Sequence, residues 1–216
     1  MCISRPTNRA DQRLVYDLFS DEQTKVFKTK CGNLPPTGDP MVARSERDGI
    51  IRIGNHNIRG TALGRGEPLE EIEAIAELGF DVKGMNEINK PWTAGNKWRY
   101  DEEMEKAVGP HHTIYASAEA GHNVKHQPGG TLLTVNGDTA RRHKAGNGDR
   151  MGRLCWMTLQ GERDEGVLIL SAYRVVHEKS DNPGPNTAYA REYSTLRSEG
   201  MKDPRPRAEV LKEIKG

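Results

Sequence analysis

The apolar residues of this chain form short runs, and apart from "LVYDLF", one possible helical turn, these runs begin only after a long polar stretch. Residues 1–48 show little periodicity and are rich in proline, glycine and charge, as linkers are. The organised part begins at "GIIRIG", in which three isoleucines predict a short buried strand that ends in polar residues. We therefore expect a mostly disordered leader over residues 1–48 and one organised domain over residues 49–216.

A helical pattern follows the first predicted strand. Over residues 66–80 the apolar side chains recur at helical spacing, Pro68 suits the first helical position, and Gly79 suits the C-terminal cap. The run "FDVKGM", which overlaps the end of this pattern, predicts a second strand. Strand, helix and strand in close succession indicate an α/β layer arrangement.

The rest of the chain contains more strand patterns and then two helical ones. Four apolar runs bounded by turn residues predict strands: "HTIYAS", "GGTLLTVNGD", "GRLCWMTLQG" and "GVLILSAYRV". In the third run, Leu154, Trp156 and Thr158 alternate onto one face. The fourth run is the most apolar, which predicts a central strand. Two helices are predicted at the end, in "NTAYAREYSTLRSEG" and "PRAEVLKEIKG". This order favours a layered α/β sandwich over a doubly wound sheet.

Composition narrows the class of protein without indicating a partner. The chain has 216 residues, of which 34% are hydrophobic, so part of it is expected to lie outside a packed core. Its 32 basic and 31 acidic residues nearly cancel, so overall charge does not favour a nucleic-acid or membrane partner. There is no apolar run of the ~20 residues that a membrane span needs, and no secretory signal pattern. We predict an intracellular protein with no membrane partner.

Three polar side chains stand where predicted strands end. Asn57 follows the first strand, Glu87 follows the second, and Tyr173 ends the most apolar one. Taken singly, these are a turn asparagine, a solvated carboxylate and a half-buried strand tyrosine. Taken together, a carboxylate and an amide oxygen are hard ligands that suit Mg²⁺, which needs only one or two protein carboxylates.

The motifs around these residues resemble those of the endonuclease/exonuclease/phosphatase superfamily, which includes DNase I. The match runs in order through Asn-Ile-Arg-Gly at 57–60, Asn-Glu-Ile-Asn at 86–89, the strand "PGGTLLTVNG" and "LSAYRV". The sequence and order of these motifs are most similar to those of the endonuclease-like domains of non-LTR retroelements. The resemblance covers residues 49–216.

This resemblance implies a fold, a chemistry and a site. The fold would be the four-layer α/β sandwich of DNase I. Glu87 would be the main ligand of Mg²⁺, or of Mn²⁺, with Asn57 beside the metal and the scissile phosphate. Tyr173 would donate a hydrogen bond to that phosphate. The reaction would be phosphodiester hydrolysis, with DNA as the partner, and a retroelement origin would place the protein in the nucleus.

The later motifs of that superfamily are missing from this chain. Members continue with an Asp-x-Asn pair and end on an Asp-His pair, whereas only His177 and no Asp-x-Asn spacing follow Tyr173. We therefore expect a truncated, N-terminal part of the domain, with weak or no nuclease activity as an isolated chain.

Four further residues are candidates for contact with a nucleic acid: Asn89, Arg141, Arg142 and Arg174. Residues 140–150, which include two of them, are also typical of a solvated loop. Two other functions stay open. The chain could be a non-catalytic retroelement remnant or binding module, or a phosphatase or phosphodiesterase of the same superfamily.

Overall fold

A four-stranded sheet forms the centre of the molecule. The computed structural model describes residues 51–61, 70–117, 127–161, 165–175 and 187–215. In the first sheet the strands lie in the order β1-β2-β4-β3, and only β1 and β2 run parallel. Their bounds are β1 Ile53–Asn57, β2 Val82–Asn86, β3 His111–Ala116 and β4 Thr131–Asn136.

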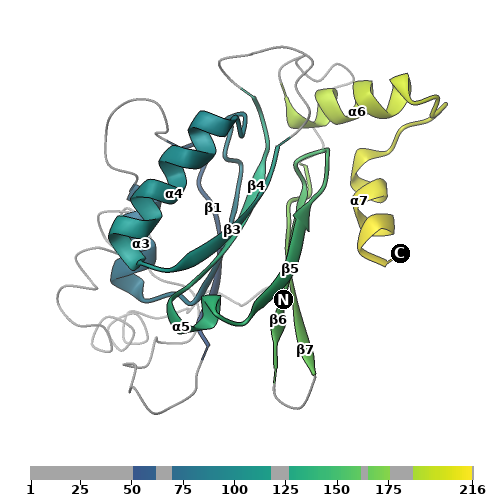
Figure 1. Cartoon of the computed structure of the whole chain (residues 1–216). Coiled ribbons are helices and arrows are strands. Elements are labelled where there is room, and N and C mark those ends of the chain that lie inside the picture. Colours follow the sequence, from purple (N-terminus) through teal and green to yellow (C-terminus); the bar gives the residue numbers. More distant parts are fainter. Residues whose placement is uncertain (1–50, 62–69, 118–126, 162–164, 176–186, 216) are drawn as a thin grey trace, which may run out of the picture.

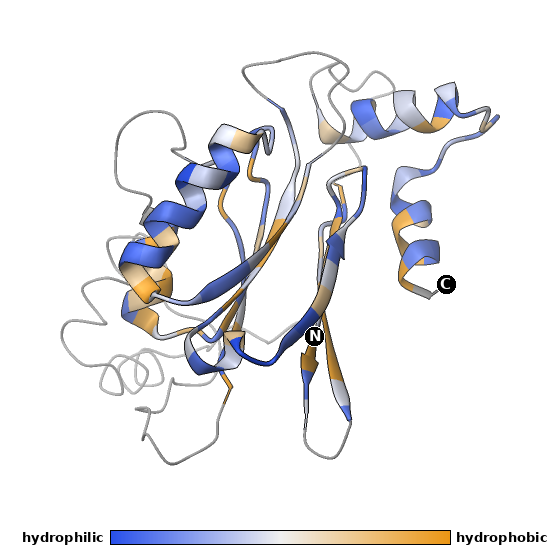
Figure 2. Ribbon diagram, in the orientation of Figure 1, coloured by the Kyte–Doolittle hydropathy of each residue, from blue (hydrophilic) through white to orange (hydrophobic). Residues whose placement is uncertain are grey.

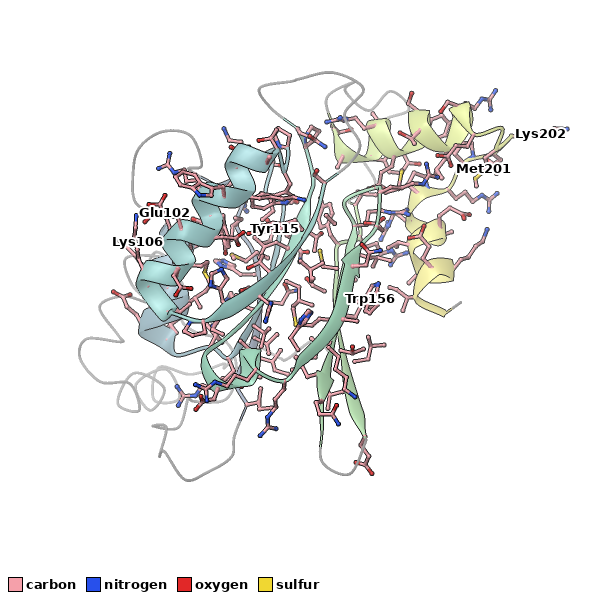
Figure 3. The ribbon with its side chains drawn as sticks, in the orientation of Figure 1. Glu102, Lys106, Tyr115, Trp156, Met201 and Lys202 are labelled. Carbon is pink, nitrogen blue, oxygen red and sulfur yellow. The ribbon has the colours of Figure 1, made fainter. Side chains whose placement is uncertain are left out.

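A three-stranded antiparallel sheet stacks against the first one. It consists of β5 (His143–Gly148), β6 (Leu154–Gln160) and β7 (Gly166–Ala172), with β6 in the middle. The predicted alternation in β6 is confirmed, because Leu154 and Trp156 lie on its outer face while Cys155 and Met157 point inward. Figure 3 shows Trp156 on the side of this sheet away from the first sheet.

Helices lie outside both sheets among the described residues (Figure 1). Helices α3 (Glu70–Leu78) and α4 (Ala94–Val108) cover the outer face of the first sheet. The short α5 (Gly137–Ala140) follows β4, and α6 (Ala188–Ser198) and α7 (Pro206–Lys215) lie beyond the second sheet. The described chain is therefore a mixed α/β fold with two stacked sheets, and the two predicted C-terminal helices are confirmed.

Both faces of β2 and β4 are buried, which gives the protein two hydrophobic cores. Between the helices and the first sheet lie side chains such as Ile75, Met85 and Tyr100. Between the two sheets lie others such as Leu133 and Met157. Figure 2 shows apolar colour along parts of the strands of both sheets and mostly polar colour along α4. Every residue of β2 and of β4 is buried as a result.

Several predicted strands are corrected by the structure. Strand β1 begins at Ile53 and runs through polar residues, and Ile51 and Ile53 are 40% and 59% exposed because β1 lies at the edge of the described sheet. Strand β7 lies at an edge of the second sheet and not at its centre. Part of the segment at 140–150 forms strand β5 and is not a loop.

Helix α4 was not expected from the sequence. Its residues are mostly charged or polar, and only Tyr100 and Met104 are buried, so its apolar pattern is weak. Both ends of α4 have the usual helix-capping residues: the Thr93 side chain accepts a hydrogen bond from the Asn96 N–H, and Gly109 stands at the C-terminal cap.

A buried arginine connects α6 and α7 to the second sheet. Arg153 is 1% exposed, and its guanidinium lies 3.2 Å from Asp149, 3.6 Å from Glu192 of α6 and 2.8 Å from Glu213 of α7. Its guanidinium also donates to the carbonyl of Pro206 at 3.5 Å. One side chain therefore joins three segments that are distant in sequence.

Two further expectations from the sequence concern the N-terminal leader and the absence of a membrane span. The disordered leader predicted over residues 1–48 lies outside the described residues. Within the described part of the chain, no helix is long and apolar enough to cross a membrane.

The two-core arrangement predicts unequal effects for two leucine truncations. Leu133→Ala removes a side chain that is 1% exposed between the sheets, so we expect a loss of about 2–5 kcal/mol in the free energy of unfolding. Leu168→Ala alters a side chain that is 66% exposed on β7, so we expect a change within about 0.5 kcal/mol. Urea unfolding measures both, and equal losses would contradict the described packing.

Candidate functional site

The ends of three strands meet at one edge of the stacked sheets. Asn57 is the last residue of β1 and pairs in register with Asn86, the last residue of β2, so Glu87 emerges beside the end of β1. The Ile58 N–H donates to the Asn86 carbonyl at 3.1 Å. From the second sheet, Tyr173 follows the last residue of β7. The parallel pairing of β1 and β2 is what brings their carboxyl ends together.

A hydrogen bond joins two of the three candidate residues, Tyr173 and Glu87. The Tyr173 hydroxyl donates to Oε1 of Glu87 at 2.8 Å, across a separation of 86 residues. Burial raises the pKa of Tyr173, and its bond to Glu87 raises the pKa further. The phenol therefore stays protonated over the physiological range and keeps its role as donor.

The backbone at Glu87 adopts an uncommon conformation. Glu87, Arg59 and Asn89 have φ angles of 56°, 54° and 55°, and no other described non-glycine residue has a positive φ. Such angles cost of order 1–3 kcal/mol each and are found where the surrounding structure holds them in place. Here the neighbouring Ile88 N–H donates to the Gly130 carbonyl at 3.3 Å, and the Thr61 N–H donates to the Ile88 carbonyl at 3.1 Å. Two adjoining loops are thus held in a strained form that presents the Glu87 carboxylate.

The Asn57 side chain is exposed at this edge and forms a local turn. Its Oδ1 accepts a hydrogen bond from the Arg59 N–H at 3.1 Å. This is the asparagine turn that was the alternative reading of the sequence. The structure thus places Asn57 next to Glu87 through backbone pairing, with its amide oxygen used by the turn.

A polar cluster between the sheets was missed by sequence reasoning. Asn86 donates from Nδ2 to Oδ1 of Asn55 at 3.2 Å, and its own Oδ1 accepts from the Thr131 hydroxyl at 3.3 Å. The Ser171 hydroxyl is also buried here and has no hydrogen-bond partner among the described residues. A Cβ at Gly84 would lie 2.7 Å from Ser171 Oγ and 2.8 Å from Asn55 Oδ1, so only glycine fits. The available signal was the alternation of Asn55 and Asn57 in β1, together with Asn86 at the end of β2.

The four predicted nucleic-acid contacts fall into two groups. Asn89 lies near Glu87, but its Oδ1 accepts from the Gly129 N–H at 2.9 Å and so fastens the neighbouring turn. Arg174 is exposed directly after Tyr173. Arg141 and Arg142 follow α5, which lies at the opposite end of the sheets from α6 and the Glu87 edge (Figure 1). The structure therefore does not bring Arg141 and Arg142 to the candidate site.

The acidic content of this edge is low. Among the described residues, no three histidine, cysteine, aspartate or glutamate side chains are grouped as they would be around a metal ion. Glu87 has one oxygen bonded to Tyr173, and Asn57 ends the strand that pairs with the residue before Glu87. A single carboxylate of this kind can hold Mg²⁺ when the ion retains most of its water.

No family model matches this chain, and no curated protein matches it either.

The hydrogen bond between Tyr173 and Glu87 predicts a specific loss of stability. Tyr173→Phe removes the donor and leaves a half-buried carboxylate oxygen unpaired, so we expect a loss of about 1 kcal/mol or more. Tyr193→Phe on α6 is the matched control, because Tyr193 is 39% exposed and its ring contact with Tyr189 is kept. Urea unfolding of both variants checks this, and a Tyr173→Phe variant as stable as the control would contradict it.

Proposed function

We propose that this chain is a Mg²⁺-dependent phosphodiester hydrolase of the endonuclease/exonuclease/phosphatase superfamily, similar to retroelement endonucleases, with DNA as substrate. The observation that carries the proposal is the hydrogen bond of 2.8 Å between Tyr173 and Glu87. The two residues come from separate motifs of the resemblance, and Asn57 of a third motif ends the strand paired with the one before Glu87. Polar loop residues without a shared role would not be expected to lie together at one edge of the sheets.

The arrangement of layers also supports the proposal. Two stacked sheets with helices on both outer sides are what a four-layer DNase I-like sandwich would contribute from these strands. The candidate residues follow the carboxyl ends of β1, β2 and β7. Loops at the ends of strands are where a sheet scaffold presents its chemistry.

Each residue has a defined role in this proposal. Glu87 would hold the Mg²⁺, or Mn²⁺, through its free carboxylate oxygen, with Asn57 beside it. When bound, the metal supplies stabilisation of charge on the transferring phosphoryl group. Tyr173 donates its single hydroxyl hydrogen to Glu87 and so fixes the orientation of that carboxylate. Donation to a phosphate oxygen, the role that the resemblance implies, would replace this bond when substrate binds. The exposed Arg174 would contact the DNA strand beside the scissile phosphate.

Weak activity is part of the proposal. No group of three acidic, histidine or cysteine side chains that could hold a metal ion forms among the described residues, and the Asp-x-Asn and Asp-His motifs that would activate water in the superfamily are missing from the sequence. Metal binding is therefore a more sensitive readout than turnover.

A non-catalytic binding module is the second candidate, and one observation favours it. The outer face of β7 exposes Leu168 by 66% and Leu170 by 40%, beside the half-buried Trp156 of β6. Exposed apolar patches of this kind are typical of contact surfaces. A phosphatase or other phosphodiesterase of the same superfamily would use the same metal site with a different substrate.

Metal titration separates these functions. We expect saturable Mn²⁺ binding to the full chain, lost in Glu87→Gln and retained in Glu77→Gln, which changes an exposed glutamate on α3. Plasmid nicking in Mg²⁺ is expected to be weak and to disappear in Glu87→Gln. Absence of saturable binding, or equal binding by Glu87→Gln, would reject the hydrolase and leave the binding module.

A further inference from the structure

A cavity of about 180 Å³ lies between α6 and two turns of the chain. Its walls come from residues 128–129, residues 150–152 and the inner side of α6. It adjoins the candidate site through backbone bonds: the Tyr173 N–H donates to the Arg153 carbonyl at 2.7 Å, and the Asn89 N–H donates to the Gly129 carbonyl at 2.8 Å. The cavity is therefore a neighbour of the Glu87 edge and not part of it.

The cavity is closed on one side by a close approach of backbone to helix. Gly129 has a φ of 88°, and a Cβ built there would lie 3.5 Å from the Cβ of Ala188 in the first turn of α6. The Thr187 side chain caps this helix by accepting from the Ala190 N–H at 3.2 Å. The positive end of an 11-residue helix thus borders the cavity.

Two arginines line the cavity, and one of them adds positive charge that no ion pair among the described residues compensates. Arg150 forms an ion pair with Glu199. Arg191 lies one turn into α6, and within the described chain its guanidinium has no hydrogen-bond acceptor. Burial lowers the pKa of Arg191, which shows that its charge is partly removed from water. A partly desolvated guanidinium without an acceptor favours an anionic ligand.

A buried carboxyl group completes the cavity. Glu192 is 4% exposed, and its Oε2 has no hydrogen-bond partner among the described residues. Arg153 lies 3.6 Å away and is shared with Asp149 and Glu213. Burial raises the pKa of Glu192 to about 8 despite Arg153, so at neutral pH the carboxyl is mostly protonated. It is then a neutral donor without an acceptor, and it does not repel an anion.

We propose that this cavity binds a phosphoryl group, with Arg191, the first turn of α6 and the Glu192 carboxyl as its donors. A helix N-terminus and an arginine are the usual partners of phosphate oxygens in proteins. The phosphoryl group would belong either to a nucleic-acid strand held at Glu87 or to a free phosphate compound. In the first case this inference rests on the proposed function, and in the second case it does not.

Calorimetric titration of the full chain with inorganic phosphate tests the site. We expect saturable binding that weakens about tenfold or more in Arg191→Gln, the effect of losing a charged hydrogen bond. Arg197→Gln, in the last turn of the same helix, is the matched control and should bind as the wild type does. No saturable binding, or equal weakening in both variants, would overturn the proposal.

The pH dependence of sulfate binding tests the role of Glu192, because sulfate keeps a constant charge. The charged and titratable groups that face Glu192 are Arg153, Asp149, Glu213 and Tyr173. Wild-type affinity should be high below about pH 8 and fall above it, as Glu192 loses its proton. Glu192→Gln should keep the affinity and remove this fall. A Gln variant that no longer binds, or one with the wild-type profile, would overturn the assigned role.

Glu87→Gln and a short DNA oligonucleotide distinguish the two proposals and the two phosphate sources. Phosphate binding should survive Glu87→Gln, so failure of the metal site would leave this inference standing. In the same way, loss of phosphate binding in Arg191→Gln would leave the proposed metal site at Glu87 untouched. If Arg191→Gln weakens binding of both the oligonucleotide and phosphate, the group belongs to a nucleic-acid strand. If it weakens phosphate binding alone, the ligand is a free phosphate compound. A variant that weakens neither overturns the site.

Discussion

The burial of one pair of strands on both faces is the constraint on which the rest of this structure depends. Strands β2 and β4 have helices α3 and α4 on one side and the second sheet on the other, and none of their residues is exposed. A strand buried on both faces has only its ends available for chemistry. Polar groups within it, such as Asn86 and Thr131, must bond to one another.

This constraint explains why a strained loop carries the candidate carboxylate. The chain leaves β2 at Asn86 and turns at once, so Glu87 takes a positive φ that its backbone neighbours hold in place. Strand β7 of the other sheet ends at the same edge, and Tyr173 reaches across to Glu87. The bond between them therefore fixes the relation of the two sheets at this edge, and Tyr173→Phe is expected to loosen it.

A buried arginine helps to connect the C-terminal helices to the second sheet. Arg153 contacts three acidic side chains from separate segments, and a buried arginine needs such partners to offset its loss of water. One of the three, Glu192, is the least well paired and faces the cavity beside α6. The same burial that raises its pKa makes it a neutral donor. The proposed phosphoryl site and the proposed metal site at Glu87 would together give a protein that binds phosphodiesters more strongly than it cleaves them.

The sequence by itself determined the α/β class, the two C-terminal helices and the alternation in β6, because these follow from local periodicity. It also indicated Asn57, Glu87 and Tyr173, since each stands where an apolar run ends. It could not reveal helix α4, whose buried face is only two side chains, or the edge position of β7, which depends on strand pairing. The separation of Arg141 from the site, the contact of Tyr173 with Glu87 and the ion pairs of Arg153 were decided by tertiary structure alone, because each depends on which distant segments pack together.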